Sequence, residues 1–220
     1  MTFISDSLNR IKPSATMVIT AKATQLKREG KKVIGLSSGE PDFDTPQHVK
    51  QAAIDAINSG YTKYTNIEGI PELRQSIVEK FKKDNDLNYD ISNVIVGTGG
   101  KQILFNALMS SLNKDDEVII PAPYWVSYPD MTLLAGGKPI FVNCSSETNF
   151  KLSGDALEKV ITKNSKWLIL NSPSNPTGSC YSISELEEIA NIVRKYENLY
   201  VMTDDIYEYI VYDNFKFYTL

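Results

Sequence analysis

The sequence contains a single histidine, His48, among 220 residues. Ser-His-Asp and Cys-His catalysis and multi-histidine metal sites all need imidazoles, so the sequence argues against each of them. His48 follows Pro46 at an expected helix start, where a surface or cap residue is the simpler interpretation. The two cysteines, Cys144 and Cys180, are far apart and form no metal-type pair. Any chemistry therefore depends on carboxylates, lysines and tyrosines, or on a bound cofactor.

The sequence also lacks a basic excess and a long apolar run. The formal net charge is −4, which disfavours binding to a nucleic-acid backbone. No apolar stretch is long enough to cross a bilayer, and the first residues do not resemble a signal peptide. We therefore expect a cytoplasmic protein with no nucleic-acid partner, no membrane partner and no bound metal.

Short apolar runs alternate with helical patterns along most of the chain. Strands are expected at residues 94–96, 117–120, 139–142, 167–170 and 199–202. Helices are expected at residues 13–29, 47–58, 71–83, 101–112, 126–135, 153–162 and 182–196. Strands that are apolar throughout, with helices between them, predict an α/β fold in which helices flank a mostly parallel sheet in three layers. The alternation stops near residue 212 without a closing element, so we expect a truncated chain.

Four unusual segments follow expected strands, at the edge where open parallel sheets bind ligands. They are residues 97–101 (GTGGK), 121–125 (PAPYW), 171–178 (NSPSNPTG) and 203–207 (TDDIY). Taken singly, each has an ordinary explanation: a tight turn, a core tryptophan, a second turn and a solvated helix cap. Their clustering at one edge is what indicates a binding site.

The residue types in these segments suit a flat anionic ligand. Glycines at a helix start let backbone N–H groups approach an anion. Trp125 offers an aromatic face for stacking, and Asn175 offers amide donors and an acceptor. Asp204 and Asp205, after a buried strand, need partners such as a metal ion or a protonated ring nitrogen.

In combination, the motifs resemble the fold type I pyridoxal-phosphate-dependent enzymes, and among these the aspartate aminotransferase family. The resemblance runs from about residue 10 to the end of the chain. It rests on the segments KPSAT (12–16), GEPDF (39–43), Tyr64, GIPELR (69–74), GGKQ (99–102), YWVSYP (124–129), NPTG (175–178) and DDIYE (204–208).

The resemblance implies pyridoxal 5'-phosphate as cofactor, an amino acid and a 2-oxo acid as substrates, and a homodimer. The implied cofactor-binding residues are Gly99, Gly100, Lys101, Trp125, Asn175, Asp204, Tyr207 and, across the dimer interface, Tyr64. The implied substrate-binding residues are Gly39, Trp125, Asn175, Lys12 and Lys101. Asp204 would pair with the ring nitrogen and keep it protonated. Lys101 would help accept acidic substrates, and Lys12 would bear on the use of prephenate.

The resemblance also defines what the chain lacks. The family's Schiff-base lysine is expected beyond Leu220, so we predict that the 220-residue chain is inactive by itself and contains no catalytic residue. Residues 1–45 are expected to form an N-terminal arm and part of the small domain. Residues 46–220 are expected to form the first part of the large cofactor-binding domain.

Three alternatives stay open from the sequence. A relative with the same fold could carry out another reaction, such as C–S lyase or other amino-acid-converting chemistry, and a substrate panel would distinguish it. A naturally short chain could bind a partner or cofactor without chemistry, which a coding sequence ending after Leu220 would favour. A nucleotide-binding sheet protein would need a Walker lysine or a ribose-binding acid, and neither is apparent.

Overall fold

The computed structural model describes residues 3–36, 39 and 41–220. The chain divides into two compact units, one formed by residues 1–11 and 71–220 and the other by residues 12–70. These units do not test the predicted domain boundary at residues 45/46, which stays a prediction.

The larger unit is built around four parallel strands in the order β2-β1-β3-β4. The strands are β1 (Glu117–Ala122), β2 (Lys138–Asn143), β3 (Ser165–Asn171) and β4 (Tyr200–Asp204). The helices of this unit are η1 (Asp6–Arg10), α3 (Pro71–Asn85), η2 (Ile91–Asn93), α4 (Gly100–Ser111), α5 (Ser127–Leu134), η3 (Ser146–Thr148), α6 (Gly154–Glu158) and α7 (Ile183–Val193).

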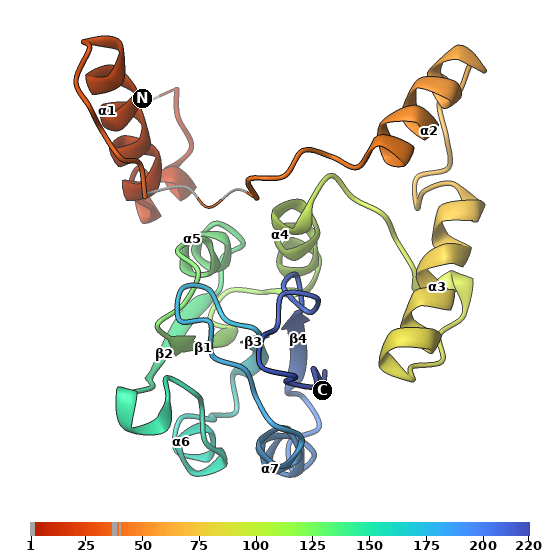
Figure 1. Ribbon diagram of the computed structural model, residues 1–220. Coiled ribbons are helices and arrows are strands. Elements are labelled where there is room, and N and C mark those ends of the chain that lie inside the picture. The colour runs from red at the N-terminus through yellow and green to blue at the C-terminus, as the bar shows by residue number, and fades with distance from the viewer. Residues whose placement is uncertain (1–2, 37–38, 40) are drawn as a thin grey trace. The chain divides into compact units, whose positions relative to one another are not determined.

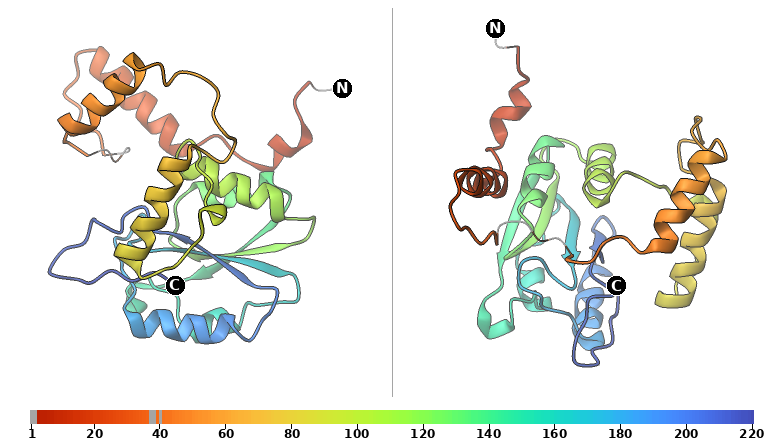
Figure 2. Two further views of the ribbon diagram at one scale, coloured as in Figure 1. Left: turned by 90° about the vertical axis from the view of Figure 1, so that its right-hand side faces the viewer. Right: turned by 45° about the horizontal axis from the view of Figure 1, so that its top comes forward.

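Helices cover both faces of this sheet (Figure 1; Figure 2). On one face, Ile119 and Leu168 of the sheet share a buried cluster with Leu157 of α6 and Ile189 of α7. On the other, Val118, Ile120 and Ile169 pack with the buried side chains of α4 and α5. Neighbouring strand residues point to opposite faces, so a strand buried on both sides must be apolar at every position. The predicted parallel sheet between two helical layers is confirmed.

A buried carboxylate ties three strands together at the edge where they begin. Glu117 of β1 is almost fully buried, and its Oε2 accepts hydrogen bonds from Thr162 Oγ1 at 2.6 Å and Ser165 Oγ at 3.3 Å. Lys138 at the start of β2 lies 3.7 Å from its Oε1. The charge is thus compensated where burial alone would be costly.

Two predicted elements are wrong in extent or kind. Residues 94–96 form no strand; Arg74 Nε donates to the Val94 carbonyl at 2.9 Å, a bond that a sheet partner would otherwise make. The helix predicted at 153–162 ends at Glu158, where Val160 N donates to Leu157 O in a tight three-residue step. Beyond that point Thr162 is bonded to Glu117.

The smaller unit, residues 12–70, contains two helices among its described residues: α1 (Ala15–Arg28) and α2 (Gln47–Asn58). Both lie close to the helices predicted there. The side chains of Val18, Ile19, Ala23 and Leu26 on α1, together with residues 33–36, line an open, mostly apolar groove of about 600 Å³.

Candidate cofactor site

A pocket of about 330 Å³ lies where β3, β4 and the start of α4 meet in the larger unit. Seven predicted cofactor residues line it: Gly99, Gly100, Lys101, Trp125, Asn175, Asp204 and Tyr207. The remaining lining residues are Thr98, Leu104, Tyr128, Asn171 and Ile206. Sequence segments up to about 100 positions apart therefore converge on one cavity. Three of them follow β1, β3 and β4, whose carboxyl ends share one edge of the sheet, and the fourth, residues 97–101, follows no strand.

The start of α4 gives the pocket an electropositive side. Gly99 is its N-cap residue and has φ +80°, a left-handed conformation that glycine adopts without strain. Among the described residues no side chain caps this helix, and Gln102 N and Ile103 N donate to Gly99 O. The N–H groups of Gly100 and Lys101 are therefore the ones available to an anion, which the helix dipole also favours. The Lys101 ammonium lies 5.0 Å from the centre of the Trp125 ring and adds a full positive charge nearby.

A carboxylate, Asp204, lies in the same pocket at the end of β4. Its Oδ2 accepts a hydrogen bond of 2.7 Å from Tyr128 Oη, and its Oδ1 accepts a long one of 3.4 Å from Ile206 N. Asn171, its register partner on β3, donates from Nδ2 to the Asp204 carbonyl at 2.6 Å. The Asp204 side chain is thus held at two points and its backbone at a third, and the carboxylate faces the cavity.

The loop that carries Asn175 is bound to the same framework. Asn171 Oδ1 accepts from Asn175 N at 2.7 Å, so one amide joins the end of β4 to this loop. Among the described residues the Asn175 side chain makes no hydrogen bond, which leaves its amide available to a ligand.

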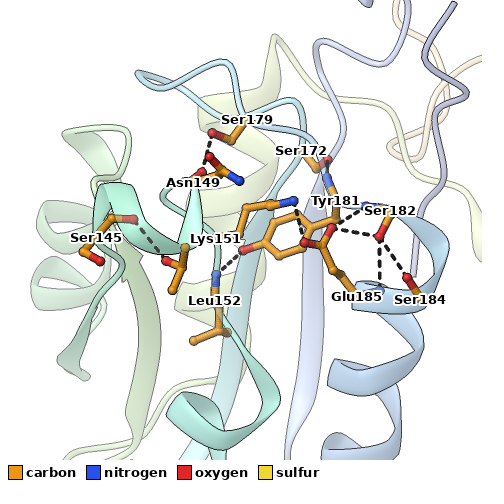
Figure 3. Close-up of polar contacts among 11 residues, drawn as sticks. Ser145, Asn149, Lys151, Leu152, Ser172, Ser179, Tyr181, Ser182, Ser184 and Glu185 are labelled. Atoms are coloured by element: carbon orange, nitrogen blue, oxygen red, sulfur yellow. Dashed lines mark hydrogen bonds and ion pairs between the residues drawn. The ribbon is translucent and has the colours of Figure 1, made fainter.

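On its outer side this loop is fastened to the segment that follows β2 (Figure 3). Ser179 Oγ donates to Asn149 O at 2.7 Å, and Leu152 N donates to the buried Tyr181 Oη at 2.8 Å. Lys151 forms a 2.5 Å ion pair with Glu185 of α7. These contacts hold the loop between two strand connections and limit its freedom to move.

Asp205, the neighbour of Asp204, does not line the pocket. It accepts a hydrogen bond of 2.6 Å from Thr219 Oγ1, and burial raises its pKa from 3.8 to about 6. Of the two aspartates after the buried strand, only Asp204 is therefore placed to meet a ligand.

Asp205→Asn is expected to stabilise the protein at neutral pH. A native pKa of about 6 against an ordinary value of 3.8 means that the native state binds the proton more tightly. Stability should therefore fall as pH rises from about 4 to about 6 and stay lower above that. Removing the charge should raise the unfolding free energy by about 1–2 kcal/mol at pH 7 and leave it unchanged below about pH 4. Urea unfolding of both proteins at several pH values measures this difference, and a pH-independent difference would contradict it.

Three predicted site residues belong to the smaller unit, residues 12–70. Lys12, Gly39 and Tyr64 are each exposed there. Their predicted contacts with substrate or cofactor stay predictions.

Among the five pocket residues without a predicted role, Tyr128 and Asn171 each left a signal in the sequence. Tyr128 follows Trp125 by three positions within the segment YWVSYP (124–129), and in the structure their ring centres lie 5.4 Å apart. Asn171 ends its strand as Asp204 ends the next one, so parallel register places them side by side.

Residues 3–36, 39 and 41–220 show neither a cluster of metal-binding side chains nor a membrane-spanning helix. No three His, Cys, Asp or Glu side chains come together there as metal ligands would, and none of the helices has the length and apolar character to cross a membrane.

The pocket fits pyridoxal phosphate in each of its parts. The start of α4 and Lys101 suit a phosphate, the Asp204 carboxylate suits a protonated ring nitrogen, and the Asn175 amide suits a phenolic oxygen. Trp125 supplies a flat aromatic surface of matching kind.

Comparison with known proteins agrees with this chemistry. A Rickettsia bellii protein named "Probable aspartate/prephenate aminotransferase" is 61% identical over 220 residues, covering all of this chain and 55% of the relative. The crystal structure of aspartate aminotransferase from Rhizobium meliloti matches with a TM-score of 0.95 and 47% identity, over 100% of this chain and 55% of that one. Aspartate aminotransferase from Thermus thermophilus with maleate matches with a TM-score of 0.96 and 42% identity, over 100% and 57%.

The chain thus spans about half the length of the curated relatives it matches. The predicted fold type I architecture is confirmed by the structural matches. The model of the family "Aminotransferase class I and II" covers residues 31–220. The chain belongs to the aminotransferase class I and II family.

Proposed function

We propose that the protein is a pyridoxal-phosphate-dependent aminotransferase that moves an amino group between L-aspartate and a 2-oxo acid. The acceptor we favour is 2-oxoglutarate, with prephenate as a further one, and the setting is the cytoplasm. The single observation that carries the proposal is that Asp204, Trp125, Asn175 and the start of α4 line one pocket. The names of the relatives support the choice of aspartate and prephenate.

The cofactor, when bound, supplies an electron sink for the carbon that bears the substrate's amino group. Asp204 would hold a proton on the ring nitrogen, because a neighbouring carboxylate stabilises the cationic form. Asn175 and Tyr207 would donate hydrogen bonds to the phenolic oxygen. Trp125 would stack on the ring and exclude water from that face.

The phosphate would be held by the backbone of Gly99, Gly100 and Lys101 at the start of α4. Tyr64 would reach the phosphate of the partner subunit in a homodimer. This role for Tyr64, like the division into an arm with part of a small domain (1–45) and a large domain (46–220), is a proposal carried by the family resemblance.

Substrate selection would depend on positive charge near the ring. The Lys101 ammonium, 5.0 Å from the Trp125 ring centre, is placed to attract the second carboxylate of an acidic substrate. The Thermus thermophilus structure is described as containing maleate, a four-carbon dicarboxylate, which supports this choice. Gly39 would lie against the substrate's other carboxylate, and Lys12 would bear on prephenate.

The activity is tested in two proteins: the 220-residue chain and a form extended to the length of its relatives, which we call the complete protein. With pyridoxal phosphate, aspartate and 2-oxoglutarate, the complete protein should form oxaloacetate, followed through NADH oxidation by malate dehydrogenase. The chain alone should form none. Turnover by the chain would refute the expectation that a required lysine lies beyond Leu220.

A substrate panel tests the reaction class in the complete protein. Release of sulfide and pyruvate from a cysteine conjugate, without transamination of aspartate, would instead assign it to the C–S lyases of the same fold.

A further inference from the structure

Tyr128, one of the pocket residues without a predicted role, contacts the carboxylate on which the proposed function depends. It lies in the first turn of α5 and is 2% exposed. Its hydroxyl donates to Asp204 Oδ2 at 2.7 Å across 76 positions of sequence. A bond of this length to a carboxylate belongs to the strong, charge-assisted class.

The same ring touches the aromatic wall of the pocket. The Tyr128 and Trp125 ring centres are 5.4 Å apart and their planes meet at 84°, an edge-to-face contact. One side chain therefore contacts both the proposed stacking surface for the cofactor ring and the proposed partner of its nitrogen. Its position is itself held, because Thr132 Oγ1 donates to the Tyr128 carbonyl at 2.9 Å.

The Tyr128 hydroxyl can act only as a donor toward Asp204. Burial, and after it the nearby Asp204 charge, raises the pKa of Tyr128 far above its ordinary value of 10. The phenol therefore keeps its proton over the whole working range of the protein. With Oδ2 engaged by this donor, Oδ1 has only the 3.4 Å contact from Ile206 N among the described residues.

We propose that Tyr128 is a positioning residue that fixes the Asp204 carboxylate, so that Oδ1 is presented to the cofactor's ring nitrogen. The inference rests on the proposed function. If Tyr128 bonded Asp204 only to give its buried hydroxyl an acceptor, removing the hydroxyl would change the stability of the fold and nothing else. A positioning residue must also change how the protein holds a ring that contains the nitrogen.

Tyr128→Phe is the informative variant, since it keeps the ring contact with Trp125 and removes only the hydroxyl. Tyr124→Phe is the matched control: Tyr124 stacks on Phe141 at 5.1 Å, and its hydroxyl makes no hydrogen bond among the described residues. Both are made in the complete protein, and the dissociation constant of pyridoxal phosphate is measured on the apo form by quenching of tryptophan fluorescence. Thermal melting of each apo protein reports folding.

We expect Tyr128→Phe to weaken binding of pyridoxal phosphate about tenfold, and Tyr124→Phe to change it less than twofold. When Asp204 is already replaced by Asn, adding Tyr128→Phe should change the dissociation constant of pyridoxal phosphate less than twofold, because Tyr128 acts through that carboxylate. The wild type and Tyr128→Phe should also bind equally tightly to a cofactor analogue that has carbon in place of the ring nitrogen.

Two outcomes separate the inference from the proposed function. A wild-type protein that does not bind pyridoxal phosphate overturns both. If the wild type binds pyridoxal phosphate normally, two results overturn the positioning role alone. One is that Tyr128→Phe binds pyridoxal phosphate as tightly as the wild type does. The other is that Tyr128→Phe weakens binding by the same factor when position 204 is Asn, or when the analogue replaces the cofactor.

Discussion

Asp204→Asn is expected to reduce the proposed aspartate aminotransferase activity of the complete protein by about one to two orders of magnitude. Asparagine has nearly the same shape and keeps an oxygen for the Tyr128 hydroxyl, which now lies 2.7 Å from Oδ2. It carries no charge, so it cannot stabilise a protonated ring nitrogen. Interactions with a charged group of this kind contribute about 1.5–3 kcal/mol, and the reacting state depends on them more than the bound substrate does.

The loss should fall mainly on kcat and be smaller in the binding of pyridoxal phosphate, because the phosphate, ring and phenolic contacts remain. Steady-state kinetics with aspartate and 2-oxoglutarate, at saturating cofactor, separates these effects. Asp205→Asn is the matched control, being the same substitution one position along. Asp205 is bonded to Thr219 and does not line the pocket, so its variant should keep activity within about twofold. Equal losses in the two variants would remove Asp204 from the proposed role.

The sheet was predictable because its two central strands, β1 and β3, are largely buried on both faces. Residues 118–120 and 168–170 are apolar without interruption, and that pattern occurs mainly in parallel sheets covered by helices. The same topology places the carboxyl ends of the strands together. This is why Trp125, Asn175 and Asp204 could be assigned to one site from the sequence alone.

The stretch at residues 94–96 has the same local pattern and still forms no strand. Its residues form the short apolar run that predicts a buried strand, but a strand also needs a neighbouring strand to bond with. Arg74 donates hydrogen bonds to the carbonyls of both Ile91 and Val94. These side-chain donors replace the backbone donors that a neighbouring strand would supply. Local sequence carries no record of such a long-range partner.

Tyr128 shows the corresponding limit for the site. It was part of the segment YWVSYP but had no predicted role, because its bond to Asp204 joins an α-helix to a strand 76 positions later. Which of several neighbouring tyrosines meets a carboxylate depends on how α5 packs on the sheet. Packing of this kind is decided by the whole core and not by a motif.

The packing of α7 leads to the largest expected effect on stability. Ile189 is fully buried in the cluster that joins α7 to Ile119 and Leu168 of the sheet. Ile189→Ala removes three carbons from a close-packed site and leaves a cavity that neighbours fill only in part. Such substitutions cost about 2–5 kcal/mol, and we expect about 3 kcal/mol here.

Ile183→Ala is the matched control on the same helix, since Ile183 is the first residue of α7 and is 50% exposed. Its change should stay within about 0.5 kcal/mol, because solvent already surrounds much of the side chain. The unfolding free energy of both variants is measured by urea unfolding followed by circular dichroism, at one fixed protein concentration. The two values can be compared if the m-value is unchanged. If the two variants lose equal stability, α7 does not bury Ile189 against the sheet. The face that supports β3 and its Asn175 loop would then have to be packed in another way.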